Sequence, residues 1–406
     1  MMWEVIKANQ RKSWVLFSLM GTVLILLGFV IGASVSPEGG LIGLIIALAI
    51  WIIMSFVSYF SGDSIMLRMS GAQLVNHNVH PQLFNIVEEM KIASGMKHMP
   101  KVYIIPQEAP NAFATGIHQD QCAVAVTAGL LSRLNRDELQ GVIAHEMSHI
   151  MNRDVLFMSF AGTLLGSIAI ISQVFLRGTY YSSFSSRRYR SSSRNNQGDG
   201  VMLIIALAVA ILAPVLTQLL YFAISRKREY LADASAVRLT RYPQGLASAL
   251  EKISSSKLDL TTATKITAPL YIANPLKQKG KKLSDLTSTH PPISERVKIL
   301  RGMQQGVNLN DYQVSFNKVK GQPELLIPAT ALKDKDPLSL RQGSSKKKGP
   351  ISPTQQAREI GDLIRRVNDF LFISCACGLT IKLPANYNRS QVQCPRCQKK
   401  YHVQKE

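Results

Sequence analysis

Long uncharged runs alternate with polar, basic stretches along this 406-residue chain. Four of these runs are 20 to 24 residues long, and a helix needs about 20 apolar residues to cross the hydrocarbon core of a bilayer. The pattern therefore predicts four transmembrane helices. The alternative interpretation is buried core helices of a large soluble protein, in which four such runs are rare. The runs are residues 14–35, 41–60, 155–176 and 201–224.

Loop charge predicts the orientation of these helices, because short cytoplasmic loops carry an excess of Lys and Arg. The segment before the first run is basic, whereas the turn at 36–40 has no Lys or Arg and suits the outside. Residues 61–154 and 225–406 then lie in the cytoplasm, in a multi-pass protein of the cell membrane. The arginine-rich loop at 177–200 conflicts with this scheme. Either the second pair of helices does not fully cross, or the larger basic regions dominate.

Short strands and one capped helix are predicted between the second and third runs. Residues 101–105 and 122–127 are apolar and β-branched, as in short strands. Asn135, followed three positions later by Glu138, fits an N-cap with a capping box. Apolar residues then recur at helical spacing, so we expect one helix over 136–152.

That helix carries a pair of histidines at the spacing of metal ligands. His145 and His149 are four positions apart, so both imidazoles face one side of the helix, and Glu146 can take a proton from a metal-bound water. A catalytic zinc needs a third protein ligand. Glu229 is the best candidate, with Asp233 behind it as an acceptor for a histidine N–H. The alternatives are solvated histidines and a salt-bridged surface helix.

Together these motifs resemble the HtpX-type membrane-bound gluzincin metallopeptidases, relatives of the CaaX prenyl proteases and the mitochondrial stress metallopeptidases. The resemblance rests on residues 145–149 and 229–233, separated by a hydrophobic insertion, as in that family. Residues 111–116 resemble the family's segment before the active helix, and 289–296 its closing motif. The resemblance covers about residues 1–305 and implies a zinc ligand at Glu229.

The resemblance also implies an activity, namely zinc-dependent hydrolysis of peptide bonds with Glu146 as general base. Asn111 and Ala112 would offer backbone hydrogen bonds to an extended peptide from an edge strand. His290 would contact the substrate or the developing oxyanion, unless it is a helix-start histidine beside prolines. The expected role is quality control of membrane or misfolded proteins. The alternatives are a dedicated protease that processes a lipidated or membrane-proximal peptide, and a non-catalytic membrane anchor that presents an interaction module.

The C-terminal tail contains four cysteines in two knuckle-like turns. Cys375, Cys377, Cys394 and Cys397 suit a structural zinc in a zinc ribbon, although the first pair is tighter than the usual Cys-x-x-Cys. A pair of disulfides is the alternative, and a reducing cytoplasm disfavours it. Basic residues give the ribbon a surface for nucleic acid, a partner protein or the anionic leaflet. They are Lys382, Arg389, Arg396, Lys399 and Lys400.

Composition narrows the remaining possibilities. The net charge of +21 excludes an acidic protein that mimics a binding partner, and the small number of cysteines, five, excludes a disulfide-dense secreted scaffold. The expected fold is a mainly α membrane protein with four transmembrane helices, a gluzincin-type α+β metallopeptidase domain and a small C-terminal zinc ribbon. We expect a low-complexity segment at 182–197 and a linker at 343–350. The expected divisions are 1–60 (first hairpin), 61–154 (first part of the peptidase domain), 155–224 (second hairpin), 225–305 (second part), 306–370 (linker and amphipathic helix) and 371–406 (ribbon).

Overall fold

The structure of the protein is a computed structural model. The structure describes residues 2–36, 38–117, 120–185, 197–263, 268–275, 290–303, 306–333, 339–343 and 352–403. Most of the predicted linker and most of the predicted low-complexity segment lie outside these residues.

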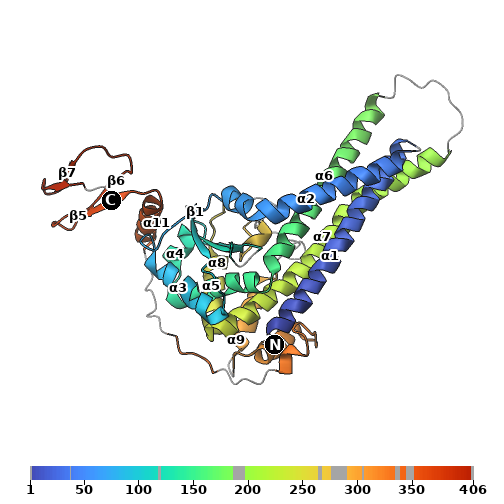
Figure 1. Ribbon diagram of the computed structural model, residues 1–406. Coiled ribbons are helices and arrows are strands. Elements are labelled where there is room, and N and C mark those ends of the chain that lie inside the picture. Colours follow the sequence, from blue (N-terminus) through green and yellow to red (C-terminus); the bar gives the residue numbers. More distant parts are fainter. Residues whose placement is uncertain are drawn as a thin grey trace.

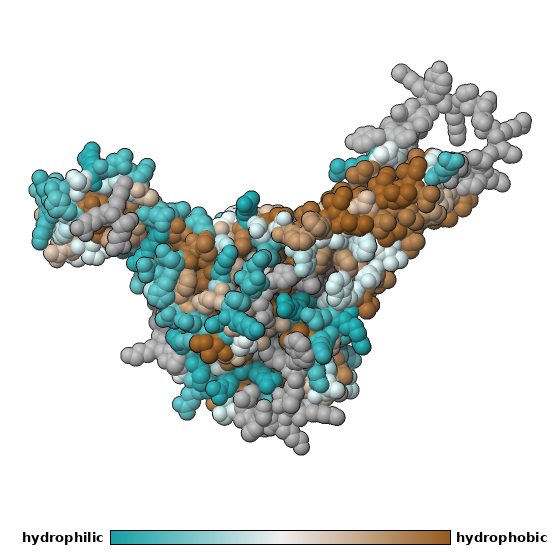
Figure 2. All heavy atoms as spheres, viewed as in Figure 1, coloured by the Kyte–Doolittle hydropathy of each residue, from teal (hydrophilic) through white to brown (hydrophobic). Residues whose placement is uncertain are grey.

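Four long helices form the membrane part of the molecule. Among the described residues, these four are long and apolar enough to cross a bilayer. The outward apolar side chains of this helical part form the brown, elongated region at the upper right of Figure 2. Leu24, Leu27, Leu164 and Ile168 are buried between the helices. The prediction of four transmembrane helices is confirmed. The helices are α1 (Met2–Val35), α2 (Gly39–Met69), α6 (Asp154–Ser185) and α7 (Gln197–Thr240).

Glycines allow α1 and α2 to pack with their backbones in contact. A Cβ atom added to Gly32 would lie 2.1 Å from the carbonyl oxygen of Gly39, and one added to Gly43 would lie 2.2 Å from that of Gly28. Two small residues spaced four apart on each helix are typical of close helix pairs in membranes. Close packing of the two helix backbones therefore stabilises the first hairpin.

A four-stranded sheet forms one layer of the domain beside the membrane helices. Its order is β1 (Gln73–Leu74), β2 (Lys101–Ile105), β4 (Ala123–Thr127) and β3 (Ala112–Thr115). β2 and β4 are parallel, and the other two pairs are antiparallel. Both predicted strands are confirmed, and β3 lies at the edge of the sheet, as the resemblance implies.

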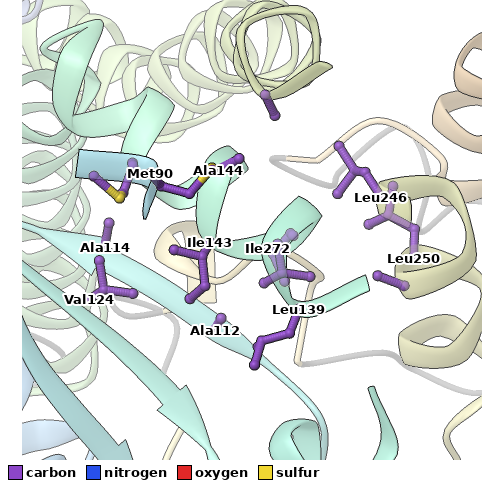
Figure 3. Close-up of a cluster of buried hydrophobic side chains, with 14 of the residues drawn as sticks. Met90, Ala112, Ala114, Val124, Leu139, Ile143, Ala144, Leu246, Leu250 and Ile272 are labelled. Atoms are coloured by element: carbon purple, nitrogen blue, oxygen red, sulfur yellow. The ribbon is translucent and has the colours of Figure 1, made fainter. Parts of the chain in front are cut away.

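Helix α5 (Arg136–Met151) packs across this sheet. Its capping box at Asn135 and Glu138 is confirmed. The side chains of Leu139 and Ile143 point towards Ala112 and Val124 of the sheet (Figure 3). The helices α3 (Pro81–Ser94), α4 (Ala128–Arg133) and α8 (Pro243–Ser255) complete the surrounding core.

The chain bends sharply between α5 and α6, whereas α7 has no break between its apolar half and its inner half. α5 ends at Met151, and Arg153 then adopts a positive φ of 59°, so α6 leaves in a new direction at Asp154. By contrast, α7 continues unbroken from its apolar half into the segment that contains Glu229 and Asp233. The segment with Glu229 and Asp233 is thus the inner end of the helix that contains the fourth run, and α7 crosses the expected division at 224.

Two helices after residue 305 pack against the same apolar core as α5. Tyr312 and Phe316 of α10 are buried in the same apolar cluster as α5, and Ile360 and Leu363 of α11 join it. The elements here are η2 (Ala268–Leu270), α9 (Ile293–Gly302), α10 (Leu309–Lys320), η4 (Ala331–Lys333) and α11 (Pro353–Val367).

Two small hairpins follow α11 and form the predicted ribbon. They pair β5 (Leu371–Ser374) with β6 (Thr380–Leu383), and β7 (Gln391–Gln393) with β8 (Lys400–His402). Figure 1 shows them beyond α11, on the side of the domain away from the membrane helices. Lys382 of the ribbon forms an ion pair with Asp362 of α11.

Candidate metal centre

Helices α5 and α7 bring His145, His149 and Glu229 together in the interior. The Nε2 atoms of the two imidazoles are 3.2 Å apart. Each Nε2 lies near one carboxylate oxygen of Glu229, at 3.6 Å from His145 and 3.5 Å from His149. The ligand atoms of all three residues lie within 4.8 Å of one another. One ion can therefore contact all three groups.

The environment of Glu146 indicates whether this arrangement suits a catalytic zinc. Its side chain is 1% exposed, and neither carboxylate oxygen has a hydrogen-bond partner within the part of the chain that the structure describes. Burial raises the pKa of this carboxyl group. A buried carboxylate without a partner is costly unless something else binds it. Two imidazoles and one carboxylate also form the ligand set of a zinc site with one open position.

A pair of charged groups lies behind His145. Asp233 Oδ1 is 2.9 Å from His145 Nδ1, which matches the expected role of Asp233 as an acceptor. Arg296 donates to both oxygens of Asp233, at 2.7 and 2.8 Å, and lies 3.2 Å from Glu229 Oε2. Burial alone lowers the pKa of Arg296, but the charge of Asp233 raises it above its ordinary value. The guanidinium therefore stays charged and holds both carboxylates.

Sequence reasoning missed the direct role of Arg296 and of a second acidic group. The sequence places Arg296 in the segment 289–296, which resembles a family's closing motif, and gives it no further role. The sequence patterns do not single out Asp154, yet its Oδ2 lies 3.0 Å from Nδ1 of His149. Its position five residues after His149 was the available signal.

The three residues expected to contact substrate lie close to the candidate metal ligands, on the edge strand or directly before it. His290 is buried, with its Nδ1 3.2 Å from Glu229 Oε2, so it faces the carboxylate. The carbonyl of Ala112 accepts a hydrogen bond from the N–H of Ile272 at 2.9 Å. The side chain of Asn111 donates to the carbonyl of Ala273, also at 2.9 Å. The chain itself therefore occupies the outer edge of β3 at this point.

The four tail cysteines form a second candidate metal group. They are free thiols, so the disulfide alternative is absent from the described residues. Sulfur–sulfur distances are 3.3 Å for Cys375–Cys397 and for Cys375–Cys377, and 3.7 Å for Cys377–Cys394. Tetrahedral zinc with Zn–S bonds near 2.3 Å separates its sulfurs by about 3.8 Å. The Tyr401 hydroxyl donates to Cys375 Sγ and lowers the pKa of that thiol to about 6.

Comparison with known proteins relates the whole arrangement to proteases. The model of "Peptidase family M48" matches residues 78–304. A "Protease HtpX homolog" of Dictyoglomus turgidum is 45% identical over 74% of this chain and 94% of its own length. Another, from Streptococcus gordonii, is 42% identical over 75% of this chain and 100% of its own length. Among solved structures, S. mikatae Ste24p matches with 20% identity and a TM-score of 0.39, over 73% of this chain and 66% of that one.

Proposed function

Because this chain belongs to peptidase family M48 and is an HtpX-like membrane metalloprotease, we propose that it is a zinc endopeptidase of protein quality control. Its substrates in this proposal are misfolded proteins and membrane proteins. His145, His149 and Glu229 bind the ion, and Glu146 is the general base. The observation that carries the proposal is the buried carboxylate of Glu146, which has no hydrogen-bond partner among the described residues and lies beside three convergent candidate ligands.

The residues around the site have separate tasks in this proposal. Zinc, when bound, lowers the pKa of its water and polarises the scissile carbonyl. Glu146 would act as the general base, taking a proton from the attacking water and giving it to the leaving amine. Asp233 accepts the Nδ1 proton of His145, which leaves Nε2 free to bind the ion. His290, beside Glu229, is placed to contact the substrate or the oxyanion.

An extended substrate peptide pairs with β3 in this proposal. Main-chain hydrogen bonds from an edge strand bind a peptide with little demand on its side chains. Such recognition fits a protease that cuts many unfolded sequences. A peptide that uses the carbonyl of Ala112 must replace the N–H of Ile272, which occupies it in this structure.

The location of the site relative to the bilayer follows from α6 and α7. Asp154 begins α6, and Glu229 lies on the inner part of α7, so the ligands lie where these helices leave their apolar segments. Loop charge supports a cytoplasmic location for this end of the helices and for the ribbon. Reporter fusions at the C-terminus and at residue 38 test the orientation. Cytoplasmic signals from both would contradict it.

The proposed activity is tested with the full chain purified in detergent. We expect cleavage of a chemically unfolded casein, loss of cleavage after zinc removal and in His149→Ala, and recovery when zinc is returned to the native chain. A prenylated peptide serves as the comparison substrate. Cleavage of the prenylated peptide alone would favour the dedicated processing protease, and cleavage of neither would contradict the enzyme proposal.

The four-cysteine cluster binds a second, structural zinc in this proposal. Four thiols at these separations form a closed tetrahedral site without an open position for water. The ribbon contains few buried apolar side chains, which lie around Cys375 and Cys394. A fold of this size is usually stabilised by its metal.

A further inference from the structure

The imidazole of His149 contacts an acidic residue that is itself bound by the first membrane helix. Its Nδ1 atom lies 3.0 Å from Asp154 Oδ2, at the start of α6. The other oxygen of Asp154 accepts a hydrogen bond from Arg228 Nη1 at 3.0 Å, and one from the amide of Asn9. Asp154, Arg228 and Asn9 are all 5% exposed or less. A charged and polar cluster thus lies in the interior, next to the proposed ligand.

Two of its contacts come from the first membrane helix, more than 130 residues away in the chain. Asn9 also donates to the backbone carbonyl of Asn152 at 3.3 Å, in the break between α5 and α6. Ser13, one turn further along α1, accepts a hydrogen bond from Arg228 Nη2 at 2.6 Å. Its own hydroxyl donates to the carbonyl of Asn9 at 2.7 Å. Helix α1 therefore touches both partners of the Asp154–Arg228 ion pair.

We propose that Asn9 and Ser13 of α1, together with Arg228, hold Asp154 so that it positions His149 for zinc. The four are positioning residues, because their effect on the metal passes through the His149 ring. Groups that accept the outer N–H of a histidine ligand fix its tautomer and orientation, and their loss typically weakens metal binding by about 10- to 100-fold. The inference rests on the proposed role of His149 as a ligand.

This chain of contacts makes the first membrane helix part of the metal site. His145 is held within the domain by Asp233 and Arg296. His149 is held through Asp154 by a helix of the membrane hairpin. A displacement of α1 relative to α6 and α7 would move the acceptor of one ligand and leave the other in place.

The test measures zinc affinity by chelator competition in the full chain, in detergent. We expect Asp154→Asn to weaken the catalytic site by about 10- to 100-fold, because the amide loses the charge that balances Arg228. Asn9→Ala and Ser13→Ala leave the Asp154–Arg228 pair intact and should weaken it less. Ser13→Thr, which keeps the hydroxyl, should restore wild-type affinity. Ser34→Ala is the matched control, because it removes a similar bond within α1, from Ser34 Oγ to the carbonyl of Ile31.

A second measurement separates positioning from a general loss of stability. In the cobalt-substituted chain, the visible spectrum of the catalytic ion depends on ligand geometry, while the thiolate site is the same in every variant. We expect Asn9→Ala to change this spectrum, and Ser34→Ala to leave it as in the wild type. Wild-type affinity and spectrum in both Asp154→Asn and Asn9→Ala would overturn the inference. Unchanged zinc binding in His149→Ala would instead overturn the proposed ligand set.

Discussion

Replacement of Glu146 by Gln is the sharpest test of the proposed chemistry. Gln has nearly the same size but cannot accept a proton, and general-base catalysis contributes about 10²- to 10⁴-fold. That range corresponds to about 3 to 5 kcal/mol of transition-state stabilisation. Since Glu146 lies beside the ligands and is not one of the three that converge, we expect Glu146→Gln to lose at least two orders of magnitude in kcat and to keep its zinc.

The burial of Glu146 adds an expectation for stability. Its carboxylate is buried, and within the described residues neither oxygen has a hydrogen-bond partner. Removing a buried charge that lacks a partner should not lower stability. We therefore expect the metal-free Glu146→Gln variant to unfold at the same temperature as the metal-free wild type, or higher. The assays are hydrolysis of unfolded casein, zinc content and thermal unfolding in detergent. Proteolysis at the wild-type rate with zinc bound would refute the assignment of the base.

Three further perturbations test other parts of the molecule. Deletion of 371–406 should reduce the zinc content from two ions per chain to one, as measured by elemental analysis, and an unchanged count would contradict the ribbon site. Gly43→Ala should destabilise the first hairpin by about 1 to 3 kcal/mol through its clash with α1; Gly166→Ala, where a Cβ meets nothing within 4 Å, should unfold in detergent like the wild type. Burial raises the pKa of Cys122 to about 11. In the zinc-free chain, iodoacetamide at pH 8 should therefore modify Cys375 much faster than Cys122. Equal rates of modification at the two cysteines, measured by peptide mapping, would contradict this.

Local sequence patterns contained the information for individual elements. The run lengths predicted α1, α2, α6 and α7, because crossing a bilayer requires a fixed length of apolar helix. The cap at Asn135 predicted the start of α5, since its hydrogen bonds join residues three positions apart. The four-residue spacing of His145 and His149 placed both rings on one face. Each of these features is decided within a few turns of one helix.

Contacts between distant segments were beyond local patterns. Asp154 is one acidic residue among 26 Asp and Glu in the chain, and nothing near it in the sequence shows that Asn9 and Arg228 converge on it. Arg296 reaches Asp233 across 63 positions. The continuity of α7 through the expected division at 224 depends on packing of both halves of that helix.

The sequence by itself determined the helices that cross the membrane and the shared face of His145 and His149, because periodicity and spacing act over short distances along the chain. Glu229 lies 80 positions beyond His149, and only the family resemblance implied its role as a ligand. The tertiary structure alone decided which charged groups orient those ligands. The groups that surround the two imidazoles come from α1, α6, α7 and α9. Only the packing of these helices brings the groups within hydrogen-bonding distance of one another.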